Sequence, residues 1–312
     1  MTALSSKILH GDQRSIARLI TLVENDDEQA IPEMKALHSH AGQALVIGVT
    51  GVMGSGKSSL IFELAYSYRK QGKTVGVIAI DPTSPFTGGA LLGDRVRMME
   101  LASDDDVFIR SMGTRGMLGG LTSSVYDVVE ILDAAGMDVI LVETVGVGQA
   151  EVDIVKIADT TLVVLVPGLG DSIQTIKAGL MEIADIFVVN KADRPGVEQT
   201  VAEIESMLDI SSSSNRRIPI VQTSTKHKQG IDHLITEIHD HITYLTSQNL
   251  FEKHRRQRYQ AELTEIIRKR LMNFIFDESR FKKTLDDFID QISKKQLDPY
   301  TAAEHILGKI LK

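Results

Sequence analysis

A glycine-rich motif near residue 50 constrains the fold of this chain more than any other feature. It matches the pattern G-x-x-x-x-G-K-[ST] and reads Gly51-Val52-Met53-Gly54-Ser55-Gly56-Lys57-Ser58. The apolar run 44–50 before it has the pattern of a buried strand, and residues 59–66 after it have the pattern of a helix. A strand, a glycine-rich loop and a helix in this order form a phosphate-binding P-loop. The motif therefore predicts an α/β fold that binds a nucleoside polyphosphate.

Each residue type in the motif has a physical role in holding phosphate. Glycines let backbone N–H groups turn towards the phosphates, and the helix N-terminus adds a positive dipole. The Lys57 ammonium supplies a charge, and the Ser58 hydroxyl is a candidate ligand of Mg²⁺. The predicted nucleotide-binding residues of this segment are Gly51, Gly54, Ser55, Gly56, Lys57, Ser58 and Ser59.

Composition excludes several classes of protein. The 312 residues are 43% hydrophobic, which suffices for a main domain of about 200 residues with helical additions. The formal net charge of -8 argues against nucleic acid as a partner. The chain has no cysteine, so disulfides, thiolate metal sites and cysteine nucleophiles are excluded.

The sequence shows no targeting or membrane signal. The first residues lack the apolar core of a secretory signal, and Asp12 and the acidic residues of segment 24–28 argue against a transit peptide. No uncharged apolar stretch approaches the roughly 20 residues that a membrane span needs. We therefore expect a cytoplasmic protein without a membrane partner.

Short apolar runs alternate with helical segments in the middle of the chain. After the first strand, strands are predicted at 74–80, 107–110, 138–143, 161–166, 186–190 and 218–223. Near-continuous Val, Ile and Leu runs are typical of parallel strands buried on both faces. Their alternation with helices predicts a doubly wound, mostly parallel sheet of the P-loop NTPase type.

Helical segments flank this predicted domain. We expect an N-terminal helical extension at 1–40, a nucleotide-binding domain at 41–245 and a C-terminal helical region at 246–312. The last region begins with a long helix predicted at about 245–274. Its basic residues, and the histidines His239 and His241 before it, are interpreted as solvated surface. The basic residues are Lys253, Arg255, Arg256, Arg258, Arg268, Lys269 and Arg270.

A second motif selects the base. Asn190-Lys191-Ala192-Asp193 follows a predicted strand, and N-K-x-D at this place is the guanine signature of GTPases. The Asp193 carboxylate is expected to accept from the two N–H donors of guanine, which adenine does not match. Lys191 is expected to lie along the base and brace the P-loop. Ser224 and Thr225, after the next strand, stand where such proteins contact the guanine carbonyl. The sequence therefore predicts GTP and GDP as ligands.

Carboxylates at the ends of other strands are candidate Mg²⁺ ligands. Glu143 ends the strand at 138–143, and Gly146 beyond it is placed to approach the γ-phosphate. Asp81 ends the strand at 74–80, and Asp94 lies in a glycine-rich segment. Hard oxygen ligands suit Mg²⁺, whereas helix capping or turn formation remains the alternative role for Asp81 and Asp94. Val147 stands where Ras-type GTPases place a water-positioning glutamine, so intrinsic hydrolysis is predicted to be slow and partner-stimulated.

At these residues the chain resembles the MeaB/ArgK/MMAA family of GTPases, which belongs to the SIMIBI class. Segments 11–14 and 19–24 and the helical tail also match, so the resemblance covers nearly the whole chain. Met53 and Ser55 depart from it, since Pro and Ala are common there. The most specific matches are Asp81-Pro-Thr-Ser-Pro85, Thr87-Gly-Gly89, Gly93-Asp-Arg-Val-Arg-Met98, Glu143-Thr-Val-Gly-Val-Gly-Gln149, Pro167-Gly-x-Gly-Asp171 and the segment 184–193.

The resemblance implies a function and further site residues. Members are GTP-dependent chaperones of adenosylcobalamin-dependent methylmalonyl-CoA mutase or related acyl-CoA mutases; they gate cofactor loading, protect or reactivate the mutase, and form homodimers through C-terminal helices. By position, Lys57, Asp94, Glu143, Gln149 and Lys177 are the implied catalytic residues, and Ser58, Asp81, Asp94 and Glu143 the implied Mg²⁺ ligands. Arg97 and Asp171 fall in implied switches.

Three alternatives remain open. A metallochaperone GTPase of the same class would carry Cys and His clusters, but this chain has no cysteine and its histidines are scattered. A protein kinase linked to amino-acid transport would need an acceptor site and a base near the γ-phosphate. A binding module whose hydrolysis times partner release overlaps with the chaperone role.

Overall fold

The structure is a computed structural model of the chain. It describes residues 2–81, 101–113, 123–144, 153–168, 180–211, 217–277 and 279–310. The chain forms two compact units, Met1–Arg258 and Tyr259–Lys312, and the division falls within one helix.

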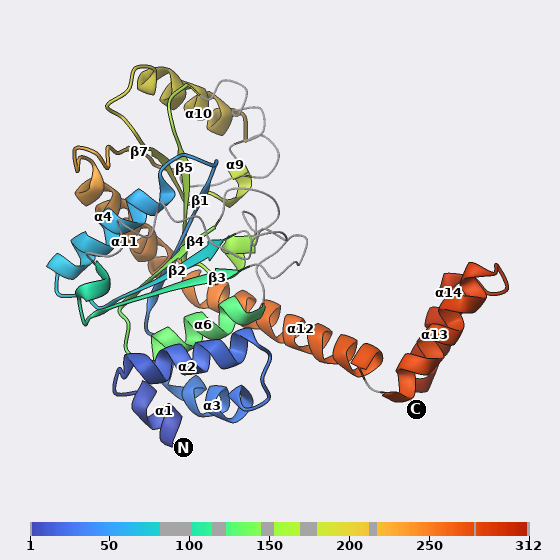
Figure 1. Ribbon diagram of the computed structural model, residues 1–312. Coiled ribbons are helices and arrows are strands. Elements are labelled where there is room, and N and C mark those ends of the chain that lie inside the picture. Colours follow the sequence, from blue (N-terminus) through green and yellow to red (C-terminus); the bar gives the residue numbers. More distant parts are fainter. Residues whose placement is uncertain are drawn as a thin grey trace. The chain divides into compact units, whose positions relative to one another are not determined.

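A seven-stranded sheet forms the centre of the first unit (Figure 1). The strand order is β3-β2-β4-β1-β5-β6-β7, and every neighbouring pair is parallel. The prediction of a doubly wound parallel sheet is thereby confirmed, with strand ends shifted by a few residues. The strands are β1 (Leu45–Gly51), β2 (Val75–Asp81), β3 (Val107–Gly113), β4 (Val139–Glu143), β5 (Thr160–Leu165), β6 (Ile186–Val189) and β7 (Ile220–Gln222).

Helices cover both faces of the sheet because successive side chains of a strand point to opposite faces. Ile47 and Val49 of β1 pack with α4 and α11, whereas Val46 packs on the face covered by α6. On that second face, α9 and α10 cover β5 and β6. The helices of this sheet are α4 (Lys57–Lys70), α6 (Ser123–Ala134), α9 (Leu180–Ile183), α10 (Val197–Ser211) and α11 (Ile231–Ser247).

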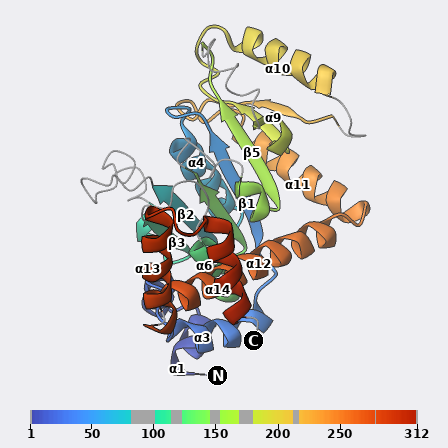
Figure 2. The ribbon, with the colours of Figure 1, turned by 90° about the vertical axis from the view of Figure 1, so that its right-hand side faces the viewer.

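Three N-terminal helices form an outer layer on α6. They are α1 (Ala3–Ile8), α2 (Gln13–Glu24) and α3 (Ala30–Leu37), and both views place them at the end of the first unit remote from α10 (Figures 1 and 2). The Asp12 carboxylate caps α2 by accepting from the Ser15 backbone N–H at 2.8 Å. The apolar stripe of α2 joins the core that it shares with α6.

The prediction of one long helix at about 245–274 is wrong about where that helix starts. The chain instead ends α11 at Ser247 and begins α12 (Phe251–Asp277) after a short break. Asn249 adopts a left-handed conformation, with φ 56°, and the Leu250 N–H donates to the Leu245 carbonyl at 2.8 Å. This hydrogen-bond pattern terminates a helix, and asparagine tolerates the conformation better than most residues. The helices α13 (Ser279–Ser293) and α14 (Pro299–Ile310) follow. No helix among the described residues is long and apolar enough to cross a bilayer.

The interpretation of Arg255 and Arg258 as solvated is also wrong. Their side chains are only 12% and 11% exposed, and both approach the carboxylate of the buried Asp159, at 3.6 and 3.9 Å. Arg255 also donates to the carbonyls of Gly42 and Ala44, just before β1. The Asp159 carboxylate in turn accepts from the Val46 backbone N–H at 2.9 Å. The start of α12 is therefore held against the segment that leads into β1.

His241 is likewise buried instead of lying at the surface. Its side chain is 5% exposed; Nδ1 lies 3.0 Å from the Thr160 hydroxyl, and Nε2 lies 3.4 Å from the Asp185 carboxylate. These contacts attach α11 to the starts of β5 and β6.

The ion cluster around Asp159 gives a prediction about stability. Burial raises the pKa of Asp159, while Arg258 and Arg255 act in the opposite direction. The substitution Asp159→Asn would leave two buried guanidinium groups without their counter-charge. We expect a loss of about 3–5 kcal/mol in the free energy of unfolding, measured by urea denaturation.

A nearby surface aspartate serves as the matched control. Asp153 pairs with Lys156 at 2.6 Å on the surface, so Asp153→Asn is expected to change the free energy of unfolding by less than about 1 kcal/mol. Equal effects of the two substitutions would contradict the importance of the buried cluster.

Candidate nucleotide-binding site

The P-loop connects β1 to α4 as predicted. Gly56 directly precedes α4, has φ 89°, and no side chain caps the helix there. A Cβ at Gly56 would lie 2.5 Å from the Asn190 side-chain nitrogen, and a Cβ at Gly51 would lie 2.1 Å from the Val164 carbonyl oxygen. Both positions therefore require glycine. The first N–H groups of α4 are left to bind an anion.

Lys57 places its ammonium group at the loop. The residue is 6% exposed, and its Nζ donates to the carbonyls of Gly51 at 2.9 Å and Val52 at 3.1 Å. These bonds hold the charge beside the backbone that would surround a phosphate.

Ser58 and Glu143 meet at the base of the loop. The Ser58 hydroxyl donates to the Glu143 carboxylate at 2.6 Å, across the junction between α4 and the end of β4. Register explains the contact, because Glu143 pairs with Val49 two residues before the end of β1. A hydroxyl and a carboxylate are both hard oxygen ligands of the kind that Mg²⁺ prefers.

The N-K-x-D segment is bound directly to the P-loop. The buried Asn190 side chain donates to the Ser55 carbonyl at 2.9 Å, and the Lys191 ammonium donates to the Gly54 carbonyl at 2.7 Å. Lys191 has a φ of 57°, which turns the chain sharply after β6. Two side chains thus join segments that are far apart in the sequence.

Asp193 lies next to Ser224, whose hydroxyl donates to its carboxylate at 2.7 Å. This hydrogen bond is the main reason that the pKa of Asp193 is lowered. The carboxylate therefore stays ionised and acts as an acceptor. Thr225 follows Ser224 in the turn before Gln229, with which Ser224 forms a backbone bridge.

The structure brings together the predicted residues that it describes. They lie at or just after the carboxyl ends of strands at one edge of the sheet, where α/β folds bind ligands: the P-loop residues, Glu143, the 190–193 segment and Ser224. The backbone of Asp81 ends β2, as predicted. The side chain of Asp81 and the residues Asp94, Arg97, Gly146, Gln149, Asp171 and Lys177 lie outside what the structure describes.

The sequence analysis did not predict that three threonines support the site by hydrogen bonding. The Thr223 hydroxyl donates to the Asn190 side-chain oxygen at 3.2 Å, so the orientation of that amide is set from both ends. The buried hydroxyls of Thr50 and Thr144 lie 2.9 Å apart at the ends of β1 and β4. A polar residue at the carboxyl end of an otherwise apolar strand was the available signal.

The residues present fit a Mg²⁺-bound nucleoside triphosphate. Uncapped helix N–H groups and Lys57 suit the phosphates, and the Ser58 and Glu143 oxygens suit Mg²⁺. Among the described residues, no group of three or more His, Asp or Glu forms a metal site of its own.

Comparisons with known proteins agree with this geometry. The family model of the methylmalonyl-CoA mutase-associated GTPase MeaB matches residues 16–280. A Pyrococcus abyssi protein named as a GTPase is 49% identical over 99% of this chain and 96% of its own length. GTPase ArgK of Escherichia coli is 33% identical over 96% and 93% of the two chains. The solved structure of a LAO/AO transport system kinase superposes with a TM-score of 0.73 at 26% identity, covering 99% of this chain and 97% of that one.

Proposed function

Because this chain belongs to the family of methylmalonyl-CoA mutase-associated GTPases, we propose that it binds and hydrolyses GTP to control a mutase. The client would be adenosylcobalamin-dependent methylmalonyl-CoA mutase or a related acyl-CoA mutase, whose cofactor loading and reactivation this chain would gate. The observation that carries the proposal is the direct bonding of the N-K-x-D segment to the P-loop, through Asn190 and Lys191. One rigid unit thereby offers a phosphate cradle and a guanine acceptor.

The chemistry at the phosphates follows from the residue types. Mg²⁺, when bound, would neutralise charge on the phosphate oxygens, and Ser58 and Glu143 are the described residues that would hold it. Lys57 would exchange its loop carbonyl partners for phosphate oxygens and stabilise their negative charge. We assign Asp81 and Asp94 to the Mg²⁺ site, Gly146 to the γ-phosphate, and Gln149 and Lys177 to the hydrolytic step.

The Asp193 carboxylate gives the first test of this proposal. Asp193→Asn replaces an acceptor with an amide that also donates, which suits the extra carbonyl of xanthine instead of the amino group of guanine. We expect GTP affinity to fall by about tenfold or more and xanthosine triphosphate to become the preferred ligand. Calorimetric titration of both nucleotides measures the change.

A matched control separates base recognition from general damage. Asp232→Asn changes a carboxylate in the first turn of α11, a residue with no predicted part in the site, and should leave the preference for GTP intact. Unchanged nucleotide preference in Asp193→Asn would refute the assigned contact.

Hydrolysis assays test the link to a mutase. GTP and ATP turnover would be measured with and without methylmalonyl-CoA mutase, using Lys57→Ala as the inactive control. We expect the mutase to stimulate GTP turnover on the order of tenfold or more while ATP turnover stays low.

The same assay also distinguishes a GTPase from a protein kinase. The kinase alternative is relevant because the solved relative is named a transport system kinase. With γ-labelled nucleotide, hydrolysis releases the label as inorganic phosphate, whereas a kinase transfers it to protein. Labelled protein, or GTP turnover indifferent to the mutase, would overturn the chaperone proposal.

We also propose that the second unit mediates a homodimer. The residues of α12 that recur every four positions form an exposed apolar stripe, whose side chains are 43–59% exposed: Tyr259, Leu263, Ile267 and Leu271. A stripe of large apolar side chains on a helix favours burial against a partner helix. A second copy of the chain offers the same stripe, and paired helices of this kind suit two-fold symmetry.

Charged substitutions test the dimer. The double variant Leu263→Glu and Ile267→Glu places two carboxylates in the stripe, and desolvating them should weaken association by a factor of about 100 or more. Light scattering coupled to gel filtration reports the mass. Lys269→Glu on another face of α12 should leave the mass unchanged. A wild-type monomer, or a double variant that remains dimeric, would contradict the proposal.

A further inference from the structure

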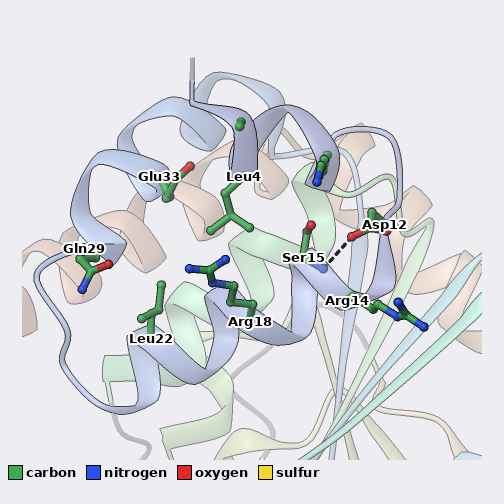
Figure 3. A pocket seen from close by; sticks show the side chains of 10 residues that line it. Leu4, Asp12, Arg14, Ser15, Arg18, Leu22, Gln29 and Glu33 are labelled. Atoms are coloured by element: carbon green, nitrogen blue, oxygen red, sulfur yellow. Dashed lines mark hydrogen bonds between the residues drawn. The ribbon is translucent and has the colours of Figure 1, made fainter.

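A cavity of about 510 Å³ lies between the N-terminal helices α1, α2 and α3 (Figure 3). None of these helices contributes a predicted residue to the nucleotide site. The volume falls within the range of small-molecule sites, roughly 300–1,000 Å³.

Three cations line this cavity, and two of them, Lys7 and Arg14, interact electrostatically with the Asp12 carboxylate. The three are Lys7 on α1 and Arg14 and Arg18 on α2. Within the described part of the chain, none of the three side chains makes a hydrogen bond or an ion pair. Figure 3 shows the Arg18 guanidinium projecting into the space between α2 and the side chains of Leu4 and Glu33.

The two carboxylates that line the cavity, Asp12 and Glu33, already accept hydrogen bonds from residues of α2 and from the start of α1. Asp12 accepts from the Ser15 backbone N–H, and hydrogen bonding from Ser15 together with Lys7 and Arg14 lowers its pKa. The Glu33 carboxylate is 8% exposed and accepts from the Ser5 backbone N–H at 3.0 Å and from the Thr2 hydroxyl. Asp12 thus caps α2, Glu33 joins α3 to α1, and the cations of the cavity remain available to a ligand.

The chemistry of Arg18 argues for an anionic ligand. Figure 3 shows Arg18 directed into the cavity, whereas Arg14 projects away from it. Guanidinium groups bind phosphate and carboxylate oxygens in a bidentate manner. The half-buried side chains of Leu4 and Leu22 add an apolar wall (Figure 3).

Helix α2 is also held firmly enough to present a fixed site. The Gln13 side chain donates to the Asp105 carbonyl at 2.9 Å, and Glu24 forms an ion pair with Arg110 of β3. Both ends of α2 are thereby fixed to the sheet domain, so Arg18 projects from a supported element.

From these observations we propose that the cavity binds a small organic anion, with a phosphate or carboxylate head on Arg18 and Lys7 and a short alkyl body against Leu4 and Leu22. This site is separate from the nucleotide site and does not depend on the proposed function.

Methyl NMR of the full chain tests the proposal at the site itself. Butyl phosphate, butyrate, inorganic phosphate and butanol would be titrated while the Leu4 and Leu22 methyl resonances are followed, so that phosphate binding at the P-loop does not interfere. We expect saturable shifts with butyl phosphate or butyrate, and weaker effects with inorganic phosphate and with butanol. Preference for one of the two anions identifies the head group.

Matched variants complete the test. Arg18→Gln should weaken the affinity of the butyl anion by about tenfold or more, since a charge-assisted hydrogen bond is lost. Lys35→Gln removes a charge from the same bundle outside the cavity and should change nothing. Should Arg18→Gln fail to fold, as judged by its melting curve, Lys7→Gln takes its place. Absent methyl shifts, equal binding of butanol, or unchanged affinity in the folded cavity variant would overturn the proposal.

Discussion

The nucleotide site depends on the hydrogen bonds that Asn190 and Lys191 donate to the carbonyls of the P-loop. They join the ends of β1 and β6 across the intervening β5. Gly56 must lack a side chain because Asn190 occupies the space that a Cβ would take. The phosphate loop and the base-selecting segment consequently form one unit. A substitution that moves one of them is expected to move the other. Thr223 strengthens this unit, because it fixes the Asn190 amide from the opposite side.

The other end of β1 is held just as closely. The Asp133 carboxylate accepts from the backbone N–H groups of residues 42–44, Asp159 accepts from Val46, and Arg255 donates to carbonyls of the same segment. The strand that carries the P-loop is thus anchored at its amino end by charged groups from α6, from the start of β5 and from α12. Packed interiors deform little, so β1 is a firm connection between these charged groups at its amino end and the P-loop at its carboxyl end.

The sequence predicted the sheet well because its strands are buried on both faces and read as continuous apolar runs. The P-loop and the N-K-x-D motif were predictable because each is a local pattern with a fixed place after a strand. Burial of Arg255 and Arg258 was not predictable, because their partner Asp159 is distant in the sequence. The local sequence of a basic helix indicates only a solvent-exposed surface. The burial of His241 was not predictable either, because it is buried by residues of two other strands. The break before α12 did have a local signal, because Asn249 tolerates the left-handed conformation that ends a helix.

In the sequence, the described residues that we propose to bind nucleotide are separate from Gln149 and Lys177, which we assign to the hydrolytic step. The described binding residues lie at strand ends and in the first turn of α4, where neighbouring strands fix their positions. The residues that we assign to the hydrolytic step, Gln149 and Lys177, instead belong to the connections that follow β4 and β5 in the sequence. A partner that acts on those connections would alter turnover without disturbing the bonds between Asn190 and the P-loop. Stimulation by a mutase would then raise the rate of hydrolysis more than the affinity for GTP, which is the behaviour that a timing device requires.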